Sequence, residues 1–230
     1  MRLERVVVVT GGASGIGLGI SKLLAKRHPL LMLDVQEDAL QAESSALRAQ
    51  GAKVLACKVD VTRREQIDAA YAAARRELGP ICIVIANASC GQSFMSLPMQ
   101  DWQTMINVNL TGVFHSVQAA LPDMLQRQWG RVVTISSHAA QRGASDRAYA
   151  AAMAGVIGLT KALARELARD GITVNTIPPS GPALDVIVRQ SLIARARTCQ
   201  DIAQACEFLC SDKAGYITGQ SIHLNGGAFI

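Results

Sequence analysis

The stretch V-V-V-V-T-G-G-A-S-G-I-G, residues 6–17, restricts the fold of this chain more than any other feature. Four valines followed by closely spaced glycines indicate a buried strand that enters a tight turn, and a helical apolar pattern starts directly afterwards. Glycines at 11, 15 and 17 let the backbone turn sharply and approach a pyrophosphate, whose charge a helix N-terminus favours. The stretch predicts a dinucleotide-binding turn. A tight turn that holds no ligand is the alternative.

The remainder of the chain alternates short apolar runs with longer helical patterns. Strands are expected at 6–9, 30–33, 53–59, 81–86, 131–135, 173–177 and 221–224. Helices are expected at 16–26, 36–50, 64–78, 99–127, 149–169 and 200–209. This alternation predicts an α/β fold with a doubly wound parallel sheet, the Rossmann fold. No repeat, low-complexity tract or linker interrupts it, so residues 1–230 are expected to form a single domain.

Composition supports this class of fold and excludes several others. Half of the residues are hydrophobic and only 4% are aromatic, which fits buried parallel strands and alanine-rich helices. The net charge of +5 is spread along the chain, so no nucleic-acid partner is expected. Six cysteines without a C-x-x-C pair indicate buried thiols in a reducing compartment and no metal site. Neither a signal peptide nor a membrane-length apolar segment is present, which predicts a cytoplasmic protein.

An aspartate at the end of the second expected strand points to the kind of dinucleotide. Asp34 follows Gly17 by 17 residues. A carboxylate there can accept hydrogen bonds from both hydroxyls of an adenosine ribose, and it would repel a 2′-phosphate. Ala13 and Ser14 in the loop add no positive charge that would offset this repulsion. NAD is therefore the expected cofactor. The alternative is that Asp34 only caps the next helix.

These residues resemble the short-chain dehydrogenase/reductase family over nearly the whole chain. T-G-G-A-S-G-I-G is similar to the family's cofactor loop, and V-D-V-T at 59–62 to the segment whose aspartate contacts adenine. A-N-A-S at 86–89 matches the family's N-N-A-G in part, with Ser89 in place of glycine. The resemblance implies an NAD(P)-binding domain. Its cofactor-binding residues would be Gly11, Ser14, Gly15, Ile16, Gly17, Asp34, Asp60, Val61, Asn87, Tyr149 and Pro179.

The resemblance also implies a set of catalytic residues. N-V-N-L-T-G-V-F at 107–114 is similar to the helix that carries the family's catalytic asparagine, which falls on Asn109. T-I-S-S at 134–137 resembles the strand end with the catalytic serine, here Ser137, and Tyr149 matches the catalytic tyrosine. In the family, a lysine four residues after the tyrosine lowers the tyrosine pKa and binds the nicotinamide ribose. This chain has Met153 at that position.

Met153 puts the proton chemistry in question. A phenol with a pKa near 10 is a poor base at neutral pH, and a thioether carries no charge that would lower this pKa. Lys161 lies about 18 Å from the tyrosine along an ideal helix, which is too far to replace the missing cation. His138, Arg142 and Arg147 lie in the loop between the serine and the tyrosine and are candidate substitutes. The simpler interpretation of each is a solvated loop residue.

Other departures from the family also fall in the nicotinamide half of the expected site. P-P-S-G-P at 178–182 has Ser180 where the family has glycine, and the expected substrate lid at 182–198 is short. Residues 92–98, the residues after Ser137, and the lid would line the substrate pocket by resemblance. The adenosine half is therefore expected to be intact and the nicotinamide half altered.

Three functions are consistent with this pattern. The first is an NAD(H)-dependent oxidoreductase that interconverts a small secondary alcohol and a ketone through Tyr149 and Ser137, weakened by Met153. The second is a catalytically silent nucleotide-binding protein that acts through subunit assembly. The third is a non-redox dehydratase or isomerase. Small alanines in the helices 99–127 and 149–169 allow close packing between subunits, which predicts a homodimer or homotetramer.

Overall fold

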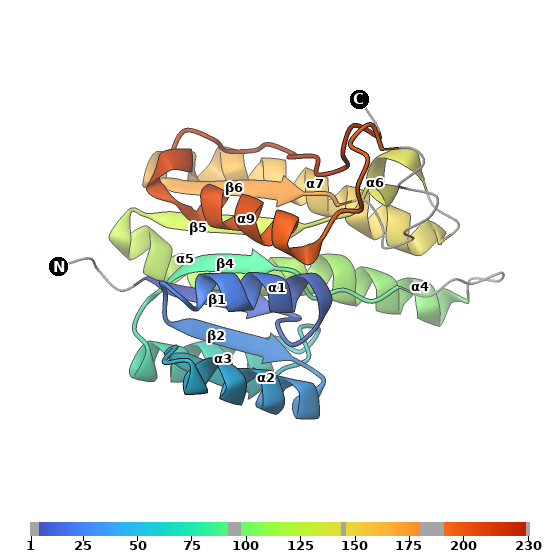
Figure 1. Ribbon diagram of the computed structural model, residues 1–230. Coiled ribbons are helices and arrows are strands. Elements are labelled where there is room, and N and C mark those ends of the chain that lie inside the picture. Colours follow the sequence, from blue (N-terminus) through green and yellow to red (C-terminus); the bar gives the residue numbers. More distant parts are fainter. Residues whose placement is uncertain (1–4, 92–97, 144–145, 180–190, 229–230) are drawn as a thin grey trace.

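The computed structural model describes residues 5–91, 98–143, 146–179 and 191–228 as a parallel sheet with helices on both faces (Figure 1). The sheet has six strands in the order β3-β2-β1-β4-β5-β6. This is the strand order of the Rossmann fold, so the predicted fold class is confirmed. The strands are β1 Val6–Thr10, β2 Leu30–Asp34, β3 Val54–Lys58, β4 Ile81–Ala86, β5 Gly130–Ile135 and β6 Ile172–Ile177.

Alternate residues of the central strand explain why helices cover both faces. Val6 and Val8 face one apolar cluster and Val7 and Val9 the other, and all four side chains are fully buried. Helices α3, α5 and α7 cover the first face, and α1, α2 and α9 cover the second. The helices are α1 Gly15–Leu24, α2 Glu37–Ala49, α3 Arg64–Glu77, α4 Met99–Ile106, α5 Gly112–Arg127, α6 Ala139–Arg142, α7 Arg147–Leu167 and α9 Cys199–Cys210.

The expected helix 99–127 is continuous in direction but not uniform. A π-helical turn, η1 at Asn107–Thr111, separates α4 from α5. Such turns widen a helix by one residue and occur frequently at functional sites. The short 3₁₀ turns η2 Ala168–Asp170 and η3 Asp212–Ala214 follow α7 and α9.

The seventh strand predicted at 221–224 is wrong for the residues that the structure describes. This segment forms an isolated bridge between Ser221 and Thr176 of β6, with the Ile222 N–H donating to the Thr176 carbonyl at 2.9 Å. Pro178, two residues after Thr176, has no N–H that could continue the pairing toward residue 224. On the other side of the bridge, the Oδ1 of Asn175 accepts from the Gln220 N–H at 3.1 Å. Regular pairing therefore does not extend.

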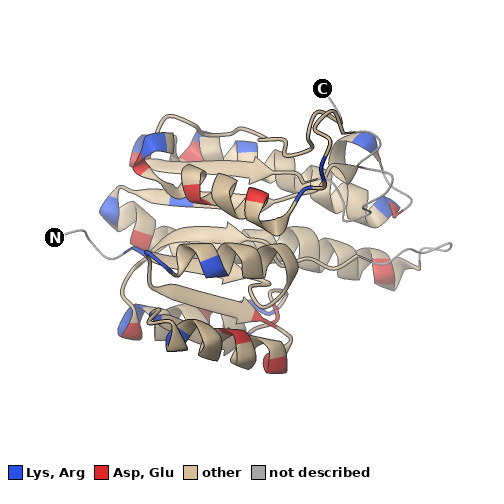
Figure 2. Ribbon diagram, viewed as in Figure 1, with Lys and Arg blue, Asp and Glu red and all other residues tan. Residues whose placement is uncertain are grey.

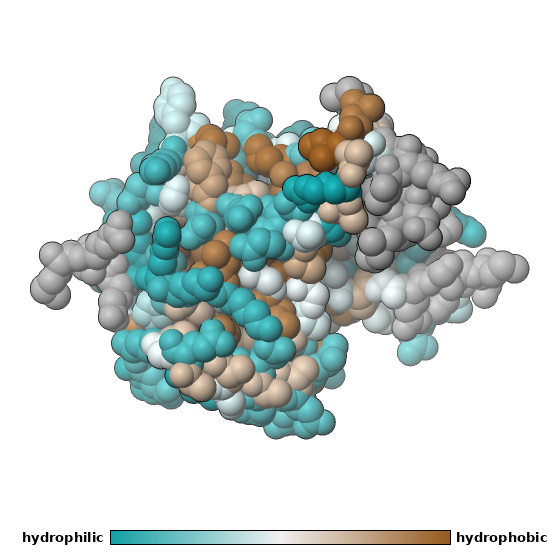
Figure 3. Space-filling model, viewed as in Figure 1, coloured by the Kyte–Doolittle hydropathy of each residue, from teal (hydrophilic) through white to brown (hydrophobic). Residues whose placement is uncertain are grey.

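Acidic and basic residues are interspersed along the helices (Figure 2). Hydrophobic residues gather at the upper edge of the molecule near the C-terminal end (Figure 3). Within the described ranges, no helix has both the length and the apolar character that crossing a membrane requires. Cys82, Cys206 and Cys210 are buried free thiols, whereas Cys57, Cys90 and Cys199 are half-buried.

One ion pair joins α3, α5 and β4 and provides a test of how these three elements pack together. Asp123 of α5 accepts from Arg75 Nε and from the Ile81 N–H, both at 2.9 Å, and its side chain is 14% exposed. Asp123→Ala should lower the free energy of unfolding by about 2–3 kcal/mol, because it leaves the buried Ile81 N–H without an acceptor and the Arg75 guanidinium with the Ala119 carbonyl but no carboxylate. Urea denaturation measures the change. Asp68→Ala, at an exposed pair with Arg64 on α3, should cost less than about 0.5 kcal/mol. Equal losses in the two variants would contradict this account.

Candidate active site

The glycine loop follows β1 at the point where the strand order reverses, the place where Rossmann folds bind nucleotides. A Cβ atom on Gly17 would lie 1.9 Å from the Gly11 carbonyl oxygen, so only glycine fits there. Gly15 has a φ of +49°, and a Cβ there would meet nothing within 4 Å. The start of α1 therefore borders open space. A phosphate in that space could accept hydrogen bonds from the first backbone N–H groups of the helix. Ser14 is the N-cap residue and makes no side-chain cap bond.

Asn87, just beyond β4, braces this loop. Its Nδ2 donates to the carbonyl oxygens of Thr10 at 3.0 Å and Gly11 at 3.1 Å. The Thr10 hydroxyl accepts from the N–H groups of Asn87 and Ala88, each at 3.0 Å. Asn87 therefore lies at the predicted cofactor site, where its amide fixes the shape of the loop.

Asp34 lies at the end of β2 with its carboxylate against the loop. Its Oδ2 accepts from the Ala13 N–H and its Oδ1 from the Gln36 N–H, both at 3.0 Å, and the residue is 6% exposed. A carboxylate has about four acceptor positions, so two remain for ribose hydroxyls. Helix α2 has Gln36 as its N-cap, and Asp34 lies two residues before that position. Asp34 is therefore not the N-cap residue of α2, although its Oδ1 accepts from the N–H of that residue.

Asp60, the predicted adenine contact, and Val61, a predicted cofactor-binding residue, follow β3. Asp60 Oδ1 accepts from the N–H of Thr62 at 2.9 Å and from its hydroxyl at 2.8 Å. Val61 is buried against Gly112, where an added Cβ would lie 2.6 Å from Val61 Cγ2. Both residues follow the carboxyl end of β3, which neighbours β2 in the sheet. They therefore lie at the same edge of the sheet as Asp34, which ends β2.

Ser137 and Tyr149 are brought together by a strand end and a helix start. Ser137 follows β5, and Tyr149 lies in the first turn of α7. The Ser137 side chain lowers the pKa of Tyr149, which indicates that the two side chains lie near each other. The Ser137 hydroxyl also accepts from the Ala139 N–H at 3.2 Å. The pair can hold an oxygen atom of a substrate between a hydroxyl donor and a phenol.

The surroundings of the phenol raise its pKa. Burial of Tyr149 is the main cause, the hydrogen bond from Ser137 acts in the opposite direction, and the charges of Asp146 and Cys90 raise the pKa further. No lysine or arginine among the described residues counters these effects on Tyr149. Tyr149 is therefore a phenol, not a phenolate, at neutral pH.

Asn109 lies in the π-helical turn η1 and is 1% exposed. Its Oδ1 accepts from the Cys90 N–H at 3.0 Å, and its Nδ2 donates to the Cys90 carbonyl at 2.9 Å. Both ends of the amide are thus used to fix the segment after β4. A Cβ on the next residue, Gly91, would lie 4.0 Å from the Tyr149 ring. Asn109 therefore fixes the position of the segment Cys90–Gly91, which lies beside the Tyr149 ring.

Met153 is 2% exposed, one helical turn after Tyr149. Its carbonyl accepts from the Ser136 hydroxyl at 2.9 Å. The thioether brings no charge to the site. Of the candidate substitutes for a cation, His138 is half-buried and its backbone N–H donates to the Pro179 carbonyl at 3.1 Å.

Comparison with known proteins identifies the family. The family model described as short chain dehydrogenase matches residues 5–189. The chain belongs to the short-chain dehydrogenase family. Two relatives of this short-chain dehydrogenase are 3-oxoacyl-(acyl-carrier-protein) reductases FabG. That of Staphylococcus aureus (strain Mu50) is 34% identical over 100% of both chains, and that of Escherichia coli (strain K12) is 35% identical over 98% of each.

A crystal structure of an actinorhodin polyketide ketoreductase variant with NADPH is also similar. It has a TM-score of 0.93 and 30% sequence identity, and the match covers 98% of this chain and 97% of that one. The predicted membership of the family is confirmed, and this short-chain dehydrogenase is an oxidoreductase of a nicotinamide-dependent family.

Two residues beside the tyrosine of this short-chain dehydrogenase were missed by sequence reasoning. Cys90 was noted only as a thiol, although its Sγ lies 3.8 Å from Met105 Sδ at the site. Asp146 is the N-cap of α7, and its Oδ1 accepts from the Tyr149 N–H at 2.9 Å. An aspartate three residues before an expected helical tyrosine was the available signal.

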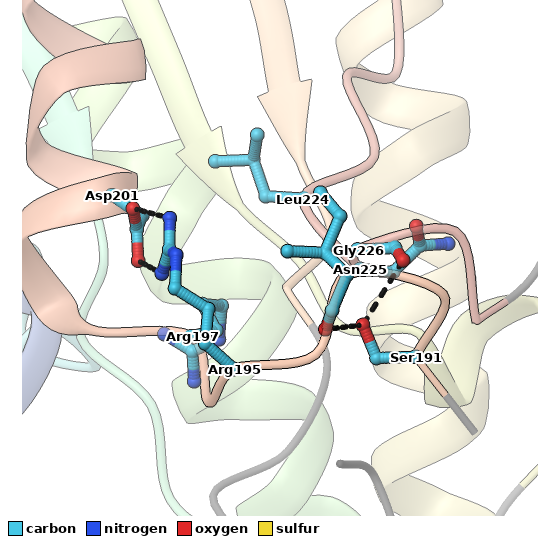
Figure 4. Close-up of a pocket in the computed structure, with 8 residues that line it drawn as sticks. Ser191, Arg195, Arg197, Asp201, Leu224, Asn225 and Gly226 are labelled. Atoms are coloured by element: carbon cyan, nitrogen blue, oxygen red, sulfur yellow. Dashed lines mark hydrogen bonds and ion pairs between the residues drawn. The ribbon is translucent and has the colours of Figure 1, made fainter. Parts of the chain in front are cut away.

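Part of the predicted substrate region lies outside the described residues. This applies to 92–97, to Ser180 and to 182–190 of the expected lid. The described end of the lid lines a cavity of about 140 Å³ together with the C-terminal segment (Figure 4). There Arg195 makes a bidentate pair with Asp201 at 2.6 and 2.8 Å. The cavity is lined by Ser191, Ile193, Arg195, Arg197, Asp201, Leu224, Asn225 and Gly226, so none of the residues predicted for catalysis borders it.

Proposed function

We propose that this short-chain dehydrogenase is an NAD(H)-dependent oxidoreductase that interconverts a small secondary alcohol and a ketone. The observation that carries the proposal is that Ser137, after β5, and Tyr149, in the first turn of α7, lie at the same edge of the sheet as the glycine loop. A bound nicotinamide supplies or accepts the hydride. Ser137 orients the substrate oxygen through its hydroxyl, and Tyr149 transfers the proton to or from that oxygen.

The protonation of Tyr149 sets the pH dependence of the two directions. A phenol with an unperturbed pKa of about 10 is ionised in roughly one molecule in a thousand at pH 7, and the raised pKa of Tyr149 makes that fraction smaller. Reduction uses the phenol, so its kcat/KM should not change with pH in the neutral range. Oxidation uses the phenolate, so its kcat/KM should rise with pH through the alkaline range.

Asp34 supports the choice of NAD. Its buried carboxylate, held by the N–H groups of Ala13 and Gln36, has acceptor positions left for ribose hydroxyls and would repel a 2′-phosphate. The related ketoreductase was crystallised with NADPH, and that observation concerns the ketoreductase. The proposal for this chain rests on its own aspartate.

Asp34→Asn should reduce the preference for NADH over NADPH by about 10- to 100-fold. It removes the repelling charge, worth about 1.4–2.7 kcal/mol beside a phosphate, while one oxygen remains as an acceptor. The ratio of the two dissociation constants, from fluorescence titration of the reduced dinucleotides, measures the change. Asp38→Asn, which removes an exposed charge in the first turn of α2, should leave the ratio unaltered. A wild-type preference for NADPH would refute the assignment of NAD.

A second function has its own observation. The buried thioether of Met153 and the raised pKa of Tyr149 favour a nucleotide-binding protein that has lost its chemistry and acts through subunit assembly. Purified protein should be given NADH and a panel of ketones, with the nicotinamide absorbance as the readout. Turnover supports the oxidoreductase, whereas tight NADH binding without any turnover supports the silent homologue.

The predicted homodimer or homotetramer also stays a proposal. Phe114 and Leu125 on α5 are 40% and 41% exposed, and a Cβ on Gly158 of α7 would meet open space. Exposed apolar side chains and small residues on long helices favour contact with a second subunit. A monomeric mass by light scattering would contradict this prediction.

A further inference from the structure

Two buried hydroxyl groups at the carboxyl end of β5 hold α7 to the sheet. The Ser136 hydroxyl, just after the last residue of β5, donates to the Met153 carbonyl at 2.9 Å. The hydroxyls of Thr134 and Thr160 are hydrogen-bonded to each other, also at 2.9 Å. Thr160 follows Met153 by seven residues, which is about two helical turns. One side of α7 is therefore bonded to the strand at two places along its length.

Ser136 lies between the two residues proposed to act on the substrate oxygen. It directly precedes Ser137, and its partner Met153 lies one helical turn after Tyr149. The backbone N–H of Ser136 donates to the Ile177 carbonyl of β6 at 2.9 Å, and the residue is 3% exposed. Ser136 is thus held by β6 through its backbone and holds α7 through its side chain.

The remaining buried side chains of α7 near Tyr149 are apolar. They are Ala148, Ala152, Met153 and Val156. Burial of apolar surface is not directional, whereas a hydrogen bond requires a narrow range of distance and angle. Among the described residues, the Ser136 bond ties the backbone of α7 to the strand end near Tyr149. The N-cap bond from the Tyr149 N–H to Asp146 stays within the first turn of the helix itself.

The proposed chemistry depends on how these two elements are placed. Ser137 follows a strand and Tyr149 lies in a helix, so their relative position is set by the contacts between β5 and α7. A proton donor must lie within hydrogen-bonding reach of the reacting oxygen. A misplacement of about 1 Å can lower a rate by about 10²-fold.

We propose that Ser136 is a positioning residue whose hydroxyl anchors the Tyr149 end of α7 to the end of β5, so that Tyr149 and Ser137 face the same substrate oxygen. The inference deepens the proposed oxidoreductase function and rests on it. Ser136 acts through the helix and does not itself contact the reacting atoms.

Ser136→Ala tests the inference, because it removes the donor and leaves the Met153 carbonyl with the N–H of its own helix. The kcat of ketone reduction should fall by about 10- to 100-fold. KM for the ketone and the dissociation constant of NADH should change by less than about threefold, the effect expected where no direct contact is lost. Ser136→Cys keeps a side chain of similar size with only a weak donor and should also lose most of the rate. Steady-state kinetics and fluorescence titration of NADH measure these quantities.

Thr160→Val is the matched control. It removes the other hydroxyl bond between β5 and α7 and keeps the shape of the side chain. Its melting temperature should fall at least as much as that of Ser136→Ala, because the fully buried Thr134 hydroxyl loses this partner. Its kcat should stay within about twofold of the wild-type value, since the Ser136 bond still holds the helix beside Tyr149.

Amide hydrogen exchange, followed by mass spectrometry of peptides from α7, reports the anchoring without any turnover. In Ser136→Ala, the amides of residues 149–157 should exchange about five- to tenfold faster, the effect of one lost hydrogen bond on local opening. Exchange in the second half of α7 should change less than that.

The outcomes separate the two proposals. A loss of kcat in Ser136→Ala and Ser136→Cys, together with an active Thr160→Val, supports the positioning role. Equal rate losses in Ser136→Ala and Thr160→Val overturn it, because they report stability alone. A Ser136→Ala or Ser136→Cys variant that keeps more than about a third of the wild-type kcat overturns it as well.

If the wild type turns over no ketone, the proposed oxidoreductase function fails, and hydrogen exchange still decides whether Ser136 anchors the helix. Faster exchange around Met153 in Ser136→Ala supports the anchor. Exchange as slow as in the wild type overturns it.

Discussion

Tyr149→Phe should lower kcat/KM for ketone reduction by about 10²–10⁴-fold. Phenylalanine keeps the ring but removes the hydroxyl, so the substrate oxygen loses its proposed proton donor. NADH affinity should change by less than about tenfold, the effect of one lost hydrogen bond. Steady-state rates and fluorescence titration of NADH separate the two effects.

The matched control is Tyr216→Phe. Tyr216 is fully exposed, so the same loss of a hydroxyl should leave both the rate and NADH binding unchanged. If Tyr149→Phe retains more than about a third of the wild-type rate, Tyr149 is not the proton donor. In that case water or another side chain supplies the proton, and the proposed mechanism must be abandoned.

The cofactor half of the site could be predicted because its sequence signals are local. Gly17 is required by its contact with the Gly11 carbonyl six residues earlier, and Gly11 by its φ of +63°. Asp34 stands at the end of a strand that apolar residues already indicate. The structure places Asn87 and Asp60 at the same edge of the sheet. Their detailed roles were not predictable, because the bonds of Asn87 to the loop join residues more than 70 positions apart.

The features that sequence reasoning missed depend on contacts between distant segments. Ser221 pairs with β6 only at one bridge, because Pro178 follows β6 and has no N–H that could continue the pairing. The pattern of residues 221–224 alone cannot reveal what the partner strand offers. Likewise, the Asn109 side chain in η1 binds the backbone N–H and carbonyl of Cys90 and so fixes Cys90 near Tyr149, which lies in α7. Asp146 was detectable in principle, as a capping residue ahead of the helix expected at 149–169.

Met153→Lys should increase both alcohol oxidation at pH 8 and ketone reduction by about 10²-fold. A cation one helical turn after Tyr149 stabilises the phenolate, and each unit of pKa that it removes is worth about 1.4 kcal/mol. Met153 is 2% exposed, so the new ammonium is partly desolvated and the free energy of unfolding should fall by about 1–3 kcal/mol. Rates across pH 6–10 and urea denaturation measure the two effects.

Met153→Leu is the control, because it keeps an apolar side chain of similar volume without a charge and should change the rates less than about threefold. The lysine variant also decides between the two proposed functions. An increase shows that Ser137 and Tyr149 still stand in a productive geometry and that only the charge is missing. Undiminished NADH binding without any turnover in Met153→Lys would instead place the loss of chemistry in the substrate-binding walls, where no single cation can restore it. The methionine would then be a consequence of lost catalysis and not its cause.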